Sequence, residues 1–128
     1  MKKELFGFEK LDVWQYAKQL TVSVYKITKD FPDNEKFGLI NQLRRAAVSV
    51  SSNIAEGSAR VSRKDQAHFF HLAYSSLMEV LSQIIISSEL KYIEKSIENE
   101  FRGEIIKLSK KINSLRNAVL KQEDFKNR

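Results

Sequence analysis

Asp65, His68 and His71 are the residues whose types and spacing come closest to a site for chemistry. On a helix, steps of three residues place the carboxylate and the two imidazoles on one face, and side chains of these types can ligate a metal ion. Metal sites in helix bundles also draw inward-facing acids from the other helices. The apolar stripes of the first and last predicted helices contain no acid. We therefore expect no metal here, and the sequence indicates no cofactor.

The sequence also lacks the other common catalytic arrangements. It contains no cysteine, which excludes disulfides, thiolate metal sites and cysteine nucleophiles. It has no glycine-rich phosphate-binding loop. Ser49, Ser51 and Ser52 follow a helical apolar pattern rather than the strained elbow of a nucleophile. We therefore expect a protein that is not an enzyme.

Cations outnumber acids, and the formal net charge is +6 with a pI of about 9.6. Such a charge favours contact with polyanions. Base-reading modules such as zinc fingers and ribonucleoprotein motifs are absent, so any nucleic acid would be recognised by charge and shape. The alternative for each cation is a solvated helix face. The candidate phosphate contacts are Arg44, Arg45, Arg60, Arg63, Lys64, Lys107, Lys110, Lys111 and Arg116.

Apolar residues recur at steps of three and four in four stretches of the chain, as on the buried face of an amphipathic helix. We predict helices at about residues 12–30, 35–57, 62–90 and 96–121. Because the connections between them are short, the sequence predicts an all-α fold, an antiparallel up-and-down four-helix bundle. This single domain would span residues 1–128, with flexible ends at 1–10 and 122–128.

Polar residues and glycine mark the predicted helix ends. Asp12 followed by Gln15 resembles a capping box at the start of the first helix, and Ser62 followed by Asp65 resembles one before the third. Gly57 is the predicted end of the second helix, because glycine commonly terminates helices.

A second stripe of small residues runs beside the apolar stripe of the second helix. Small side chains let another backbone approach closely, either a helix of the same bundle or one of another subunit. The third helix has an apolar stripe beside its core stripe, and so much apolar surface indicates a homo-oligomer. The residues of these two stripes are Ala46, Ser49, Asn53 and Gly57 on the second helix, and Ala67, Tyr74, Met78, Leu81 and Ile85 on the third.

Two acids stand where they need a partner. Glu79 lies inside an apolar segment, so we predict a buried ion pair with Arg44 or Arg45 on the second helix. Glu56 lies near the predicted carboxyl end of that helix, where the helix dipole disfavours an acid, so Arg60 or Arg63 is expected to compensate it.

The amino-terminal residues have no signal-peptide pattern. No stretch approaches the roughly 18 apolar residues that cross a bilayer. We expect a cytoplasmic protein without a membrane partner.

The second helix carries a motif that resembles a known family. The run of Gln42 to Gly57, with Arg44 and Arg45, is similar to the signature of bacterial four-helix bundle proteins encoded in intervening sequences of 23S ribosomal RNA genes. The segments 8–17 and 69–80 are similar to the family's first and third helices. Relatives of that family are the accessory variability determinant proteins of diversity-generating retroelements. Ser75 and Lys91 stand where family members often have glycine.

The resemblance implies a homopentameric barrel with a basic surface, and in the retroelement relatives it implies nucleic-acid binding beside a reverse transcriptase. Structured RNA or an RNA–DNA hybrid is therefore the favoured ligand. The alternative is a scaffold that docks a reverse transcriptase or another locally encoded protein. Such a partner would contact exposed aromatic residues, for which the candidates are Phe6, Phe8, Trp14 and Tyr25.

Overall fold

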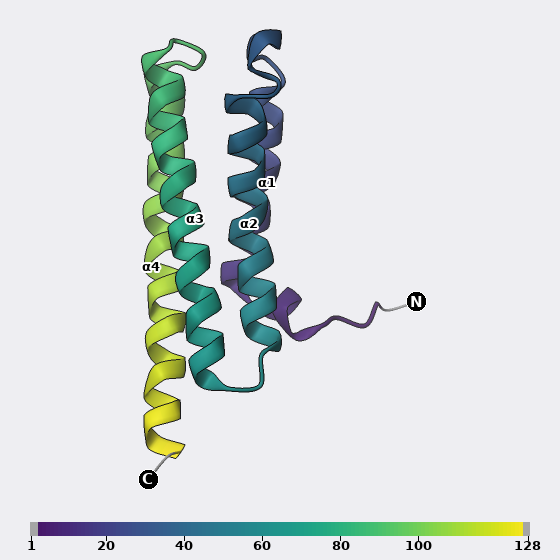
Figure 1. Ribbon diagram of the computed structural model, residues 1–128, viewed down its shortest axis with the longest axis vertical. Helices are drawn as coiled ribbons and strands as arrows, with labels where there is room; N and C mark the ends of the chain where they lie inside the picture. Colours follow the sequence, from purple (N-terminus) through teal and green to yellow (C-terminus); the bar gives the residue numbers. More distant parts are fainter. Residues whose placement is uncertain (1–2, 127–128) are drawn as a thin grey trace.

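The protein is an antiparallel four-helix bundle, as its periodicity predicts. The computed structural model describes residues 3–126, without the side chains of residues 123–126. The α1–α2 hairpin lies beside the α3–α4 hairpin, and all four helices run along the long axis (Figure 1). The elements are the 3-10 helix η1 (Gly7–Lys10), α1 (Asp12–Thr28), the 3-10 helix η2 (Asp33–Glu35), α2 (Leu39–Ala59), α3 (Arg63–Glu89) and α4 (Lys95–Lys126).

The helix ends differ from the predicted ones by a few residues. α2 begins later than predicted, at Leu39, because the 3-10 helix η2 and Gly38 occupy the predicted first turn. At the other end of the chain, α4 continues to Lys126. The predicted flexible end at residues 1–10 contains η1, and residues 1–2 and 127–128 lie outside the described part.

The core consists of the apolar stripes that the spacing predicts, one from each helix. Burial of such stripes is the main force that holds a bundle together, at about 25 cal/mol for each Å² of apolar surface removed from water. The fully buried large side chains include Val24 of α1, Leu43, Val50 and Ile54 of α2, Phe70, Leu77, Val80 and Ile84 of α3, and Ile105 and Ile112 of α4.

α3 is the most apolar helix of the bundle. It contains an 18-residue window with a mean hydropathy of 1.4, which meets the usual criterion for a membrane-crossing helix, so the prediction that no segment would do so is wrong. A helix that packs in the core of a bundle meets the same criterion. Phe70, Ala73, Leu77 and Val80 are buried within the bundle core, which accounts for part of the apolar composition.

Gly57 does not end α2, contrary to the sequence prediction, because the helix continues to Ala59. Gly57 is buried, and a Cβ atom there would lie 2.7 Å from Cε1 of Phe70 and 3.1 Å from Cβ of Phe69. The absence of a side chain therefore lets α2 approach α3 closely, which is a packing role rather than a capping role.

The two predicted capping boxes have different outcomes. Ser62 caps α3, because its hydroxyl oxygen accepts a hydrogen bond from the Asp65 amide at 3.0 Å. Asp12 does not cap α1: its carboxylate binds Nζ of Lys111 at 2.8 Å, and Gln15 donates to the carbonyl of Glu9. The Asp12 prediction is wrong because a cation from α4 competes for the carboxylate.

Lys91 ends α3 in the left-handed conformation, with φ of 64°. The amide of Tyr92 donates to the carbonyl of Ser87, and the amide of Lys91 donates to that of Ser88, both at 2.9 Å. This is a Schellman ending, in which glycine normally occupies the left-handed position. Lys91 holds that position with a Cβ atom present, which is unfavourable for a residue other than glycine.

We predict that Gly57→Ala destabilises the protein by about 1–3 kcal/mol, because the new methyl group overlaps the Phe70 ring in a packed core. The matched control is Gly103→Ala in α4, where a Cβ atom meets nothing within 4 Å. Since alanine favours helix, the control should gain about 0.5–1 kcal/mol. Urea unfolding of both variants measures the difference, and equal effects would contradict the close approach.

We also predict that Lys91→Gly raises the free energy of unfolding by about 1 kcal/mol, because glycine adopts the left-handed conformation without steric cost. This corresponds to a Tm increase of about 3–6 °C for a chain of this size. Lys91→Ala removes the same side chain but keeps Cβ, so it should give no such increase. Thermal unfolding followed by circular dichroism compares the two variants.

Candidate nucleic-acid interface

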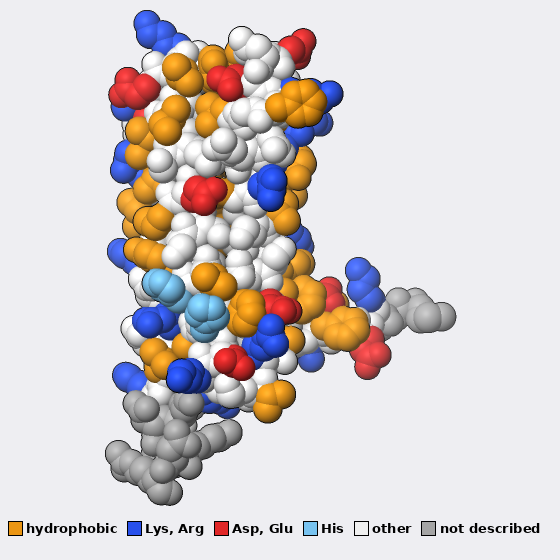
Figure 2. Space-filling view, in the orientation of Figure 1, with side chains coloured by type: hydrophobic (Ala, Val, Ile, Leu, Met, Phe, Trp, Pro, Cys, Tyr) orange, Lys and Arg blue, Asp and Glu red, His pale blue; other side chains and the backbone are white. Residues whose placement is uncertain are grey.

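Cations gather at one end of the bundle. The α2–α3 turn and the carboxyl-terminal half of α4 lie at this end, which is the lower end in Figure 1. From residue 105 to residue 122 the chain contains five cations and no acid, whereas residues 94–104 contain four glutamates and two cations. Figure 2 shows Lys, Arg and His side chains near the lower end of the visible face. We call the Lys and Arg residues of residues 60–64 and 105–122 the basic end.

The α2–α3 turn holds its cations in a network of contacts. Arg60 forms an ion pair with Glu56 at 3.1 Å, as predicted, and its guanidinium lies 4.5 Å from the centre of the Phe69 ring. Arg63 donates to the side-chain oxygen of Gln66, and the side-chain amide of Gln66 donates to the carbonyl of Arg60. These contacts orient both guanidinium groups at the turn, which is useful for binding a phosphate.

Arg63 and Lys64 occupy the first turn of α3. The amino-terminal end of a helix carries a partial positive charge, which disfavours cations and favours anions. The two side chains therefore stand where folding alone would select acids. Together with the helix end, they create a positive field at the turn.

The α4 cations are partly held by α1. Lys111 binds Asp12 at 2.8 Å, and this hydrogen bond raises the pKa of Lys111 and lowers the pKa of Asp12. Lys107 and Lys111 also lie within 5.4 Å of the centre of the Tyr16 ring. Lys110 is exposed, whereas Arg116 is half-buried and its Nε atom has no hydrogen-bond partner in the described part.

The predicted ion pair between Glu79 and Arg44 or Arg45 is wrong. Arg44 faces α1, where Nε donates to the Thr28 hydroxyl at 2.8 Å and the guanidinium lies 4.6 Å from the Tyr25 ring centre. Arg45 is exposed. Glu79 is also exposed, so water solvates its carboxylate, and within the described residues its hydrogen bond comes from Gln83.

The small-residue stripe of α2 packs against α3 in the same bundle. Ala46 and Gly57 are buried, and the hydroxyl oxygens of Ser49 and Ser76 are 2.8 Å apart. The Asn53 amide donates to the Ser49 carbonyl at 2.8 Å. Serines are therefore tolerated here because their hydroxyl groups form a hydrogen bond with each other across the close contact between α2 and α3.

The second apolar stripe of α3 is only partly used by the bundle. Ala67 is buried, and Tyr74, Met78 and Leu81 are half-buried against the core. Ile85 is half-buried as well, and the adjacent Ile86 is exposed. Apolar surface therefore remains on α3 after the bundle has formed.

Glu98 is a buried acid that the sequence analysis missed. Only 3% of its side chain is exposed, and its two carboxylate oxygens bind Lys95 at 3.0 Å and Arg102 at 3.1 Å. Hydrogen bonds from Lys95, Ser88 and Arg102 lower the pKa of Glu98 to about 2. The spacing of Lys95, Glu98 and Arg102 on one helix face was the signal that could have revealed this cluster.

The suggested metal ligands do not form a cluster. His68 and His71 are exposed, and the His68 ring lies edge-on to Phe69. Within residues 3–122, no group of three His, Asp or Glu side chains could hold a metal ion.

The candidate aromatic contacts are divided between packing and solvent. Phe8 packs edge-on against Trp14 with ring centres 4.9 Å apart, and both are half-buried. Tyr25 is partly covered by Arg44. Phe6 is 73% exposed, so it is the aromatic side chain of this set that is most available to a partner.

Comparison with known proteins identifies one family. The family model for the 23S rRNA-intervening sequence protein matches residues 9–114. The fold is similar to the crystal structure of a protein with unknown function from the S23 ribosomal protein family of Bacteroides thetaiotaomicron, with a TM-score of 0.73 and 19% identity. That similarity covers 81% of this chain and 97% of the other, and it shows a shared fold. No curated protein matches the sequence.

We predict that Glu98 makes stability depend on pH in acid. Its folded pKa of about 2 is below the ordinary value of 4.5, so its stabilising contribution is present above about pH 4.5 and is lost as the pH falls toward 2. Glu98→Gln should therefore reduce the decline in Tm between these pH values. The control is Glu79→Gln, which removes an exposed carboxylate. Equal pH profiles for wild type and Glu98→Gln would contradict the assignment.

Proposed function

Since this chain belongs to the family of 23S rRNA-intervening sequence proteins, we propose that it is a non-enzymatic homo-oligomer that binds nucleic acid through its basic end. The observation that supports this most is the separation of charge along the bundle. The part of α4 after residue 104 carries five cations without an acid up to residue 122, and the α2–α3 turn adds three. A compact cationic region of this kind binds phosphates by releasing counterions.

Electrostatics at the α2–α3 turn also support a ligand. Arg63 and Lys64 oppose the dipole of α3, so they contribute little to folding and would gain from a bound anion. Arg60 and Lys111 already have acid partners, whereas Lys64 and Lys110 are exposed. A phosphate at the turn could therefore bind the oriented guanidinium groups of Arg60 and Arg63 and the solvated amine of Lys64.

Structured RNA or an RNA–DNA hybrid is the proposed ligand. Both have helical geometry of the A type, which proteins recognise largely through backbone and shape rather than base edges. The basic end lies on the α2–α3 turn and on α4 of one bundle, so the fold fixes the spacing of the backbone positions that carry its cations. Recognition would then depend on the spacing of phosphates and would tolerate many sequences.

Apolar side chains on two different sides of the bundle support self-association. One group lies on the α1–α2 hairpin and the other on the α3–α4 hairpin, and Figure 2 shows hydrophobic side chains along both long edges of the visible face. Contact between two different surfaces repeats around a closed ring. A ring, pentameric according to the family resemblance, would multiply the field of one basic end. The exposed residues are Val22, Tyr25 and Val48 on one hairpin and Ile86 and Ile106 on the other.

A second candidate function is a scaffold for another protein, such as a reverse transcriptase, as the resemblance to retroelement accessory proteins suggests. The observation in its favour is Phe37 in the α1–α2 connection, which is 87% exposed. Association with such a partner would be largely insensitive to salt, because apolar contact does not release counterions.

We predict that replacing Arg60, Arg63 and Lys64 together with glutamine lowers affinity for structured RNA. Each lost phosphate contact should reduce the slope of log K against log salt by about 0.7–0.9. The control variant replaces Lys26, Lys29 and Lys36 with glutamine. It removes the same number of positive charges from the opposite half of the bundle. Fluorescence anisotropy across a salt series measures both variants.

The two variants separate a local site from net charge. A loss confined to the first variant would support the basic end, whereas equal losses would indicate a general charge effect. Absence of binding by the wild-type protein at low salt would overturn the nucleic-acid proposal and favour the scaffold. Unfolding curves check that the variants fold. The first variant should remain folded, because it removes two cations that interact unfavourably with the positive amino-terminal end of α3.

A further inference from the structure

The segment before η1 is an extended arm that projects from the bundle. Residues 3–6 have no regular secondary structure, and Figure 1 shows them leaving the α2 side of the bundle. Leu5 is exposed and Phe6 is 73% exposed. Two large apolar side chains therefore stand in water at the end of a short, extended segment.

The direction of the arm is fixed by η1. The Phe6 amide donates to the Glu9 carboxylate at 3.0 Å, and the Phe6 carbonyl accepts from the Glu9 amide at 3.1 Å. η1 packs against α1 and α2. The arm therefore leaves on the side away from α4 (Figure 1).

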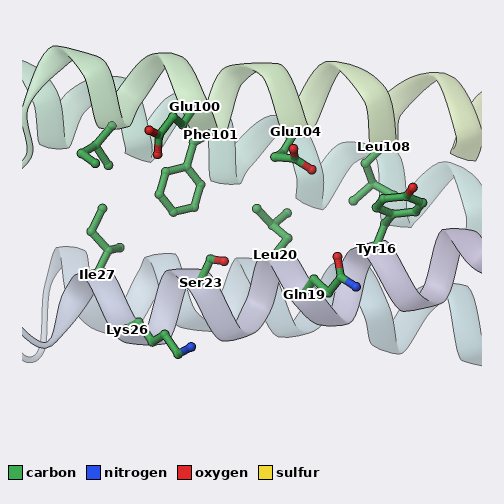
Figure 3. Close-up of a pocket in the computed structure, with 11 residues that line it drawn as sticks. Tyr16, Gln19, Leu20, Ser23, Lys26, Ile27, Glu100, Phe101, Glu104 and Leu108 are labelled. Atoms are coloured by element: carbon green, nitrogen blue, oxygen red, sulfur yellow. The ribbon is translucent and has the colours of Figure 1, made fainter.

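A groove of about 550 Å³ runs between α1 and α4. These two helices make the fewest contacts of the four neighbouring pairs, so the bundle is open along this seam. The floor of the groove is apolar, and Figure 3 shows Leu20 and Ile27 of α1 opposite Phe101 and Leu108 of α4. Ile97 completes the apolar floor.

The two rims of the groove have different charges. Glu100 and Glu104 lie on the α4 rim, whereas Lys26 of α1 lines the groove but directs its ammonium group away from α4 (Figure 3). Ser23 lies between them on α1, with its hydroxyl directed toward the groove (Figure 3). The groove would therefore suit an apolar segment that presents a cation to the α4 rim.

The arm matches the groove in length and in charge. The α1 wall extends from Tyr16 to Ile27, or about 16 Å at 1.5 Å for each helical residue. The four residues of the arm, 3–6, span about 13 Å when extended, so the arm fits within this length. Because successive side chains of an extended chain point in opposite directions, Lys3 can face the acidic α4 rim while Glu4 points to the α1 side, away from those acids.

We propose that the arm of one copy of this chain docks in the α1–α4 groove of the next copy. Leu5, on the same side of the arm as Lys3, packs against the apolar side chains of α4, Phe6 packs against those of α1 on the opposite side, and Lys3 binds Glu100 or Glu104. The arm and the groove are different surfaces, so the contact is heterologous and repeats around a ring. This inference rests on the homo-oligomer proposed above and names the contact that forms it.

Disulfide trapping tests the contact, because the chain has no cysteine of its own. We would co-express a tagged Phe6→Cys chain with an untagged Ser23→Cys chain and oxidise the purified protein mildly. The expected product is a mixed disulfide dimer on a non-reducing gel. The control pair replaces Phe6→Cys with Phe37→Cys, since Phe37 is 87% exposed and lies in the α1–α2 connection. The control should give at least tenfold less mixed dimer.

A complementation experiment tests the same contact without a covalent bond. Leu5→Ser with Phe6→Ser removes the apolar part of the arm, and Ser23→Trp fills the groove. Each variant alone should be monomeric in sedimentation velocity, with association weakened on the order of 100-fold by the loss of two buried side chains. An equal mixture retains one intact arm and one intact groove, so it should form dimers. Phe37→Ser should keep the wild-type size.

The outcomes separate this contact from the proposed function. If wild type is oligomeric but the arm variant keeps its size and no mixed disulfide forms, the arm-and-groove contact is wrong and the homo-oligomer stands. A disulfide within one chain that carries both Phe6→Cys and Ser23→Cys would show that the arm folds onto its own groove, which also overturns the proposal. A monomeric wild-type protein overturns both the contact and the homo-oligomer, while RNA affinity is measured independently.

Discussion

The close approach of α2 to α3 is the constraint on which the other features depend. Gly57 has no Cβ atom, so the Phe70 ring occupies the space beside the α2 backbone. Ser49 and Ser76 satisfy each other across the same contact at 2.8 Å. A side chain larger than these would separate the two hairpins and expose the core between them. The small-residue stripe is therefore explained by packing inside one chain, and it leaves other surfaces to contact a partner.

Tight packing on the α2–α3 side coincides with an open seam on the other. α1 and α4 contact each other least, and several residues that line the space between them are polar. In a closed bundle these positions would be apolar, because core positions that face a neighbouring helix are buried. Gln19, Ser23, Glu100 and Glu104 thus limit the stability of an isolated chain and suit a surface that another segment covers.

Local patterns in the sequence predict the helices and their buried faces, since these depend on residues three and four apart. Contacts between distant residues were not predictable in this way. Local spacing predicts that Asp12 caps α1, but Lys111, 99 residues away, binds its carboxylate. The apolar neighbours of Glu79 predict that it is buried, yet its side chain is exposed to solvent. The Lys95, Glu98 and Arg102 cluster could have been predicted from spacing. The groove could not, because it arises from how two hairpins sit together.

The same tertiary arrangement explains how a modest net charge can become a strong local field. Acids and cations are mixed near Glu98, where two cations neutralise a buried carboxylate. Farther along α4 the acids end, and the antiparallel topology brings this segment to the end where α3 begins with Arg63 and Lys64. The field at that end is therefore a product of helix order as well as composition. Copies joined through their grooves would keep the cations of the α2–α3 turn free, since the groove and this turn share no residue.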